Sequence, residues 1–360
     1  MSTFANAAFA ALLCDWCLEV QEGQRILVEA ETVAEPALAA VEAALLERGA
    51  WPFLVVEPAG ALPRLLDHGR DHHLDAENPF AAALIETADA SLRILAPTNT
   101  RELTGADPQR LARRARGQRE LHERLLAKRW ALSIWPTAAL AQEAGMSLEA
   151  YSAFIARALF LDQADPAAAW AELSTRQAEL CERLTPAREI RIRSEGTDIS
   201  FRVEGRRWIN SDGRRNMPSG EVFSAPHEGS AQGHVHFDIP SNRLGAAVVG
   251  AELTFVDGVV TEAHAEAGED VLLAALETDP GARRLGEIGI GTNTGIDRAT
   301  GSTLLDEKIG GTIHLALGRS YPECGGVNES AVHWDLVCDL RSGGELLVDG
   351  ELLSRDGQFV

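Results

Sequence analysis

The chain has 360 residues, 45% hydrophobic and 24% charged, which is the composition of an ordinary folded protein rather than of a disordered or fibrous one. Its length favours two domains over one. The 54 acidic and 33 basic side chains give a formal charge of −21, which disfavours binding to nucleic-acid phosphates or to anionic membrane surfaces.

Two features favour a cytoplasmic protein. The apolar N-terminal stretch 1–20 has no basic leader, and Asp15 and Glu19 interrupt it before it reaches membrane-spanning length, so we expect an amphipathic helix there. The five cysteines are odd in number and lack the spacing of a disulfide framework, as is typical of a reducing compartment. We therefore expect neither a membrane nor a nucleic acid among the partners of this protein.

The first half of the chain alternates short apolar runs with alanine-rich helical segments such as 34–48. Four of the apolar runs are predicted to be strands: 25–29, 53–56, 91–96 and 131–135. Strands that alternate with helices indicate a mostly parallel sheet with helices packed on its faces. The first half is therefore predicted to be an α/β domain.

A long helical segment, 151–184, follows, and Thr185-Pro186 ends it because proline disfavours helical structure at the preceding residue. Beyond this point the pattern changes to short alternating strands separated by Gly, Asn and Asp turns. We therefore expect an α/β domain over residues 1–185 and an α+β, β-rich domain with the metal ligands over residues 186–360.

His333 and Asp335 lie two residues apart in an alternating segment, AVHWDLVCDL. In a strand both side chains point to one face, while the apolar residues between and beyond them point to the other. This pattern predicts a strand with one face that binds ligands and one face that packs into a core.

Two more strands show the same separation of faces, and a turn supplies a further carboxylate. His314 in TIHLALG shares a face with the small Ala316, and Glu287 in GEIGIGTN shares a face with Gly289. Because these neighbours are small, we expect room beside each ligand for an ion and a substrate. In NMPSGEVFSAP, Glu221 follows a Pro-Ser-Gly turn at the edge of a strand, from where its carboxylate can reach into a cleft.

These segments together supply carboxylates and imidazoles: Glu221, Glu287, Asp335, His314 and His333. A single catalytic zinc ion needs about three protein ligands, so a larger set with an excess of oxygen donors suits two ions that share a bridging carboxylate or water. Zn, Co and Mn all accept such a mixture of nitrogen and oxygen ligands. The expected cofactors are therefore two divalent metal ions.

The order of four motifs resembles one known family. NMPSGEVFSAP, LGEIGIGTN, LLDEKIGGTIHLALGRSYP and NESAVHWDLV are similar to segments of the metallo-aminopeptidases of peptidase family M29, the thermophilic aminopeptidase T group. The resemblance covers most of the chain from about Tyr151 onward, and the motifs are specific because all four occur in the right order. Before Tyr151 the organisation is compatible, but no motif is diagnostic.

The resemblance implies a set of metal ligands: Glu221, Glu287, His314, His333 and Asp335. Glu287 would be the bridge between the two ions, and Tyr321 would lie close to them as a ligand or as a donor to an oxyanion. Glu307 matches an acidic position that contacts the second ion, although its spacing to His314 is longer than in the best-known members.

The expected activity is that of an aminopeptidase, which releases N-terminal residues from peptides. A water held between two cations loses its proton near pH ~7 instead of ~15.7 and would attack the first peptide carbonyl. Tyr321 or one ion would stabilise the oxyanion, and Glu221 or Glu287 would carry a proton to the leaving amine. The expected partners are peptides with a free N-terminus and, by the resemblance, a second copy of the chain in a homodimer.

Two other functions fit part of the pattern. His314, His333 and Asp335 match a triad that holds Fe(II), so a ring-cleaving dioxygenase of related fold, acting on dihydroxypyridines, is an alternative enzyme. A protein that keeps the fold without catalysis is the other alternative, but none of the expected ligands is missing. Glu221 and Glu287 favour two hydrolytic ions over the single iron of a dioxygenase.

Overall fold

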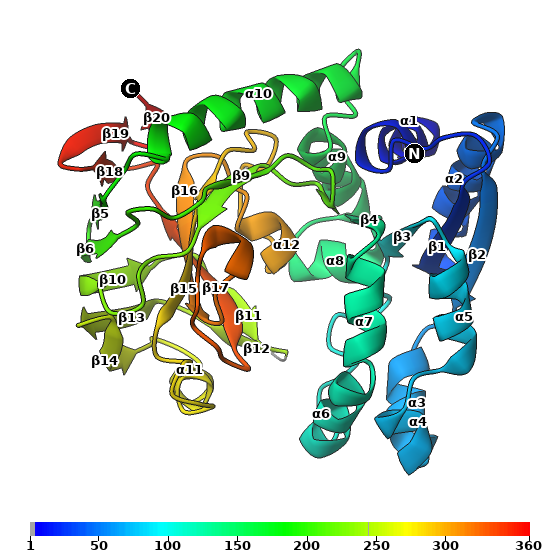
Figure 1. The fold of residues 1–360 in the computed structure, drawn as a ribbon, viewed down its shortest axis with the longest axis horizontal. Helices are drawn as coiled ribbons and strands as arrows, with labels where there is room; N and C mark the ends of the chain where they lie inside the picture. The colour runs from blue at the N-terminus through cyan, green and yellow to red at the C-terminus, as the bar shows by residue number, and fades with distance from the viewer. Residues whose placement is uncertain (1–3, 244) are drawn as a thin grey trace. The chain divides into compact units, whose positions relative to one another are not determined.

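The computed structural model describes residues 4–243 and 245–360 (Figure 1). The chain forms two compact units. Unit 1 contains the residues up to Trp170 together with Gly213–Pro218, and unit 2 contains Ala171–Asp212 and Ser219–Val360. The division therefore falls inside helix α10 (Pro166–Leu184), whereas the boundary between residues 185 and 186 stays a prediction.

Unit 1 is built on a five-stranded sheet in the order β2-β1-β3-β4-β8, in which all neighbouring strands are parallel. Its strands are β1 (Arg25–Glu31), β2 (Trp51–Glu57), β3 (Ala90–Leu95), β4 (Arg129–Ile134) and β8 (Asn216–Met217). The four predicted strands and the α/β class are confirmed. The fifth strand was not predicted, because its two residues lie far along the chain, in the segment that returns to unit 1.

The helices of unit 1 are α1 (Asn6–Leu12), the π-helix η1 (Leu13–Cys17), the 3₁₀ helix η2 (Thr32–Ala34), α2 (Glu35–Glu47), α3 (Ala61–His68), α4 (Asp71–Asp75), α5 (Pro79–Thr87), α6 (Pro108–Gly117), α7 (Arg119–Leu126), α8 (Ala138–Glu143) and α9 (Leu148–Ala158). Side-chain oxygens of Asn78, Asp107, Thr137 and Ser147 accept backbone N–H groups at the starts of α5, α6, α8 and α9. Such caps define where a helix begins, because the first N–H groups otherwise lack partners.

Unit 2 contains two antiparallel sheets and a hairpin. The larger sheet has eight strands: β14 (Val259–His264), β13 (Ala251–Val256), β10 (Gln232–Phe237), β6 (Thr197–Arg202), β5 (Glu189–Ser194), β18 (Glu345–Val348), β19 (Glu351–Arg355) and β20 (Gln358–Phe359). The smaller has five: β17 (His333–Asp339), β16 (Thr312–Gly318), β15 (Leu285–Gly291), β9 (Glu221–Ser224) and β7 (Ile209–Ser211). The hairpin pairs β11 (Ser241–Arg243) with β12 (Ala246–Val248). The prediction of a β-rich second half is confirmed.

Besides the part of α10 from Ala171 onward, the described residues of unit 2 form three short helices: α11 (Glu269–Leu276), α12 (Thr303–Asp306) and the 3₁₀ helix η3 (Pro322–Cys324). Within residues 4–243 and 245–360, no helix combines the length and the apolar character needed to cross a membrane.

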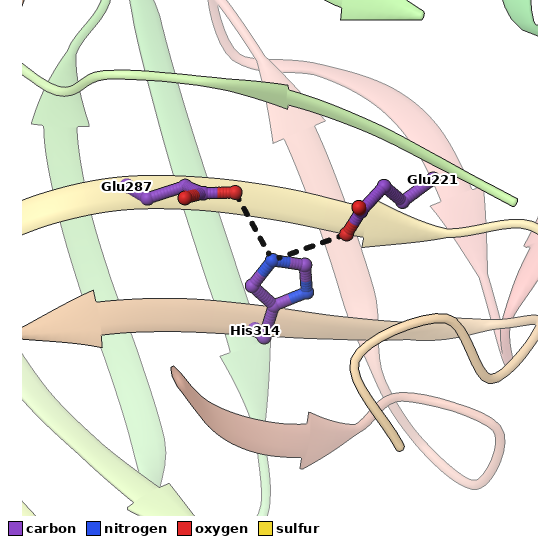
Figure 2. A group of neighbouring side chains, drawn as sticks. All are labelled: Glu221, Glu287 and His314. Atoms are coloured by element: carbon purple, nitrogen blue, oxygen red, sulfur yellow. Dashed lines mark hydrogen bonds and ion pairs between the residues drawn. The ribbon is translucent and has the colours of Figure 1, made fainter. Parts of the chain in front are cut away.

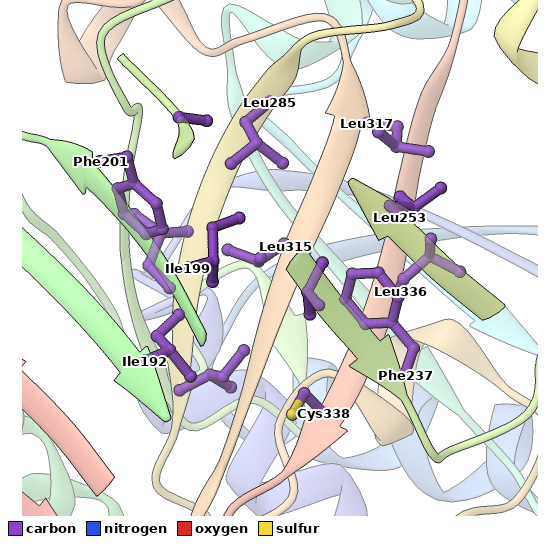
Figure 3. Close-up of a cluster of buried hydrophobic side chains, with 14 of the residues drawn as sticks. Ile192, Ile199, Phe201, Phe237, Leu253, Leu285, Leu315, Leu317, Leu336 and Cys338 are labelled. Carbon is purple, nitrogen blue, oxygen red and sulfur yellow. The ribbon is translucent and has the colours of Figure 1, made fainter. Parts of the chain in front are cut away.

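The five-stranded sheet of unit 2 has two different faces. One face carries polar side chains, including Glu221, Glu287 and His314 (Figure 2). The other face packs against the eight-stranded sheet, so that residues such as Leu315 and Phe237 share one buried core (Figure 3). Because fully burying one such apolar side chain contributes about 1.5–3 kcal/mol, and a slip of one residue would exchange the two faces, the core fixes which side chains lie on the polar face.

Candidate metal centre

Five of the residues predicted to bind metal converge on the polar face of the five-stranded sheet of unit 2. Each lies in a strand whose alternate residues belong to the core: Val222 in β9, Ile288 in β15, Ile313 in β16, and Trp334 and Leu336 in β17. The structure thus brings Glu221, Glu287, His314, His333 and Asp335 together from four neighbouring strands.

Among the described residues, two groups of side chains each bring their potential ligand atoms within 4.8 Å of one another. Glu221, Glu287 and His314 form the first group, and Glu287, His333 and Asp335 form the second. In the first group, Nε2 of His314 lies 3.3 Å from Oε1 of Glu287 and 3.5 Å from Oε2 of Glu221. In the second, Nε2 of His333 lies 3.4 Å from Oε2 of Glu287 and 3.6 Å from Oδ1 of Asp335. Glu287 therefore presents one carboxylate oxygen to each group.

A β-bulge lets Leu285 enter the core while Glu287 stays on the polar face. Leu285 pairs with Leu317 and Glu287 pairs with Ala316, so that Gly286 is an extra residue in β15. Without the extra residue, Leu285 and Glu287 would share one face; with it, Leu285 enters the core and Glu287 does not. Only glycine fits at the bulge, because a Cβ atom on Gly286 would lie 2.4 Å from the carbonyl oxygen of Arg319.

The small residues beside the ligands have two different roles. A Cβ atom on Gly289 would lie 2.0 Å from Cε1 of His314, so the imidazole ring occupies the space that the sequence suggested for an ion or a substrate. Ala316 lies between Glu287 and Asp335 in the register of the three strands. Its short side chain leaves the two carboxylates free to approach the same imidazole.

Backbone carbonyl groups orient both imidazoles. Nδ1 of His314 lies 3.0 Å from the carbonyl oxygen of Glu307, and Nδ1 of His333 lies 2.8 Å from that of Arg319. A carbonyl oxygen only accepts, so each Nδ1 carries the proton and donates it, and each Nε2 faces the carboxylates. The lone pair of a neutral Nε2 would then face negatively charged oxygens, an arrangement that requires a cation or a proton between them.

The pKa values in the cluster also indicate that it requires additional positive charge, from a cation or from protons. Burial alone would lower the pKa of His314, but the hydrogen bond to Glu287 and the charges of Glu221 and Asp335 raise this pKa to about 10. Burial raises the pKa of Glu221 to about 7, against the effect of Lys308, and burial together with the charge of Glu307 raises the pKa of Asp335 to about 6. Without a metal ion, the cluster therefore holds protons.

Tyr321 lies beside the second group. Its hydroxyl is 3.4 Å from Nε2 of His333, and its ring packs against the rings of His333 and Phe223 with centroid distances of 5.0 and 5.5 Å. Burial, and then the charges of Glu287 and Asp335, raise the pKa of the Tyr321 phenol well above its usual value. The hydroxyl therefore stays protonated and can act as a hydrogen-bond donor.

Glu307 and Lys308 lie beside the first ligand group, next to His314 and Glu221. Glu307 is in neither ligand group: its carboxylate forms an ion pair with Lys308, and its carbonyl orients His314. Lys308 is completely buried, and its Nζ also lies 3.4 Å from Oε1 of Glu221. Lys308 was not predicted from the sequence, because it lies in a turn after α12, where no periodicity marks a functional side chain.

The donor set fits divalent metal ions. Oε2 of Glu221 is buried and has no hydrogen-bond partner among the described residues, and it faces Nε2 of His314. An unpartnered buried carboxylate oxygen is costly, and a cation bound by this oxygen and Nε2 would satisfy both atoms. Carboxylate oxygens mixed with imidazole nitrogens are ligands that Zn, Co and Mn accept.

Three comparisons with known proteins cover the whole chain. Residues 5–359 match the model of a family described as thermophilic metalloprotease (M29). Aminopeptidase 2 of Geobacillus stearothermophilus is 31% identical over 97% of this chain and 94% of its own length, and aminopeptidase T of Thermus aquaticus is 30% identical over 95% and 93%. The structure of wild-type AmpT from Thermus thermophilus matches with a TM-score of 0.85 and 25% identity and covers 99% of both chains. The similarity thus includes residues before Tyr151.

Proposed function

This chain belongs to the thermophilic metalloprotease (M29) family, and from this premise we propose that it is a metal-dependent aminopeptidase, a hydrolase that releases N-terminal residues from peptides. The observation that carries the proposal is the pair of ligand groups that share Glu287. The names of the similar proteins support a peptide substrate with a free N-terminus.

We propose that Glu221, Glu287 and His314 hold one divalent ion and that Glu287, His333 and Asp335 hold the second, with Zn, Co or Mn as the metal. When bound, such ions polarise a carbonyl group and lower the pKa of a water molecule from ~15.7 to ~7. The two oxygens of Glu287, each of which faces one imidazole, support its role as the bridge.

Three side chains of the site would act on the substrate. Tyr321 would donate its hydroxyl proton in a hydrogen bond to the oxyanion that develops at the scissile carbonyl, because its hydroxyl lies beside the second ligand group, 3.4 Å from Nε2 of His333. Glu221 and Glu287 are the two carboxylates proposed to carry a proton to the leaving amine.

Purified protein tests the proposal directly. We expect it to hydrolyse a panel of aminoacyl chromogenic amides, to lose this activity with a chelator and to regain it with Zn, Co or Mn. The same amides with an acetylated amino group are the control and should not be hydrolysed. Glu287→Gln should remove both the activity and the bound metal, measured by elemental analysis. Equal hydrolysis of the blocked amides, or activity that is indifferent to the chelator, would contradict the proposal.

The comparisons do not favour the dioxygenase alternative, because every relative named above is a hydrolase by name. Oxygen uptake with dihydroxypyridines should therefore be absent. By the family resemblance we also propose a homodimer, and the five free cysteines support a proposed cytoplasmic location. Size-exclusion chromatography with light scattering tests the first, and a monomeric active species would exclude it.

A further inference from the structure

Lysine is almost absent from this protein. Among the 33 basic side chains, only Lys128 and Lys308 are lysines, and all others are arginines. Lys128 lies near the surface of unit 1 and donates to the carbonyl oxygens of Ile85, Glu86 and Ala88. Lys308 is completely buried beside the candidate metal ligands. A compact ammonium group on a thin chain is not interchangeable with a planar guanidinium at such a site.

The ammonium group of Lys308 has two acidic neighbours. It forms an ion pair with Glu307 and lies 3.4 Å from Oε1 of Glu221. The other oxygen of Glu221, Oε2, faces Nε2 of His314. One oxygen of the Glu221 carboxylate therefore faces the fixed cation of Lys308, and the other oxygen faces the imidazole of His314 in the first ligand group.

Among the described residues, the second ligand group lacks a comparable ion pair. Within the part of the chain that the structure describes, Glu287 forms ion pairs with His314 and His333, Asp335 forms one with His333, and neither pairs with a lysine or an arginine. A fixed positive charge repels a divalent ion most strongly at the position closest to it. The two candidate metal positions therefore differ in the positive charge that lies next to them, although they share Glu287.

We infer that Lys308 makes the two metal positions unequal: the position of Glu287, His333 and Asp335 fills first, and the position of Glu221, Glu287 and His314 fills only at a higher metal concentration. The inference rests on the proposed function in one respect, namely that both groups bind divalent ions. Lys308 is in neither ligand group, and it acts on the nearer position through its charge and through its contact with Glu221.

Titration of the metal-free full-length protein with Mn²⁺ tests the inference. We expect isothermal titration calorimetry to resolve two binding steps whose dissociation constants differ by at least about tenfold. Electron paramagnetic resonance of the same samples should show an isolated Mn²⁺ at one equivalent and a spin-coupled pair only near two. Two steps of equal affinity in the wild-type protein would overturn the inference.

Three variants assign the two steps. Lys308→Met should strengthen the weaker step by at least about tenfold and leave the tighter step in place, whereas the control Lys128→Met should change neither. Glu221→Gln should remove the weaker step alone, and Asp335→Asn should remove the tighter one. If Lys308→Met does not fold, the wild-type titration with Glu221→Gln and Asp335→Asn still decides the order.

The other possible results of these titrations also either support or overturn the inference. A single bound ion in the wild-type protein and two in Lys308→Met would support the inference, whereas a single ion in both would overturn it. If the protein hydrolyses aminoacyl amides but binds two ions equally, only the role of Lys308 fails. If it binds no divalent ion at all, the proposed function fails as well.

Discussion

Replacing Gly289 by alanine is expected to displace a metal ligand without unfolding the protein. The added Cβ atom would lie 2.0 Å from Cε1 and 2.2 Å from Nε2 of His314. The imidazole must therefore retreat by more than about 1 Å before the atoms reach an ordinary contact distance. Its Nδ1 is held by the carbonyl oxygen of Glu307, so the ring cannot move without losing this hydrogen bond or its approach to Glu221 and Glu287.

The expected magnitudes follow from this displacement. Misplacing a reacting or binding group by about 1 Å costs on the order of 10²-fold in rate, so we expect kcat to fall by about that factor. Overpacking costs about 1–3 kcal/mol, and the preference of strands for alanine over glycine offsets about 0.5–1 kcal/mol of this cost. The free energy of unfolding should therefore fall by no more than about 2.5 kcal/mol, and the variant should remain folded.

Hydrolysis of an aminoacyl amide, metal content and urea denaturation measure these effects. Gly229→Ala is the matched control, because a Cβ atom on Gly229 would have no neighbour closer than the carbonyl oxygen of Asp257 at 4.0 Å. This control should keep both its metal and its activity. If Gly289→Ala also hydrolyses the amide within about twofold of the wild-type rate and keeps the same metal content, then the contact with Gly289 does not position His314, and the reasoning is refuted.

Three further predictions concern the same site. Tyr321→Phe should lower kcat by about 10²–10³-fold with little change in KM, because it removes one donor to the oxyanion; steady-state kinetics that show an unchanged kcat would exclude this role. Ala316→Leu should weaken metal binding at both positions, because the larger side chain separates Glu287 from Asp335. Calorimetric titration with Mn²⁺ measures the two affinities, and unchanged affinities would contradict the prediction. Free metal at about 100 times its dissociation constant should stabilise the protein by about 2.7 kcal/mol and raise the melting temperature of unit 2 by about 5–10 °C. Differential scanning calorimetry with and without chelator measures this shift, and no shift would be seen if the site bound no metal.

The architecture was accessible from the sequence wherever a local pattern determines the structure. Alternation with a period of two predicted that His333 and Asp335 share a face opposite Trp334 and Leu336, and the core contains the latter two residues. The alternation of strands with helices predicted the parallel sheet of unit 1. Both patterns are local, because burial of one face of a strand or helix selects apolar residues at fixed intervals along the chain.

Pairing between distant segments could not be predicted in this way. Strand β8 consists of only Asn216 and Met217 and joins the sheet of unit 1 beside Leu132 and Ser133 of β4. Two residues carry no measurable period, and nothing in the local pattern names their partner. The bulge at Gly286 was missed for a related reason, since an extra residue in a strand is defined only by the strand opposite it.

Candidate ligands were named from strand faces and from the family resemblance, but their surroundings were decided by the tertiary structure. The sequence determined that Glu287 and His314 lie on polar strand faces and that Gly289 and Ala316 are small. Only the folded chain brings the imidazole of His314 into the space left by Gly289 and brings the ammonium of Lys308 against Glu221. The physical reason is that a repeat along the chain reports the direction of a side chain, whereas contact, burial and charge depend on residues that are distant in sequence and close in space.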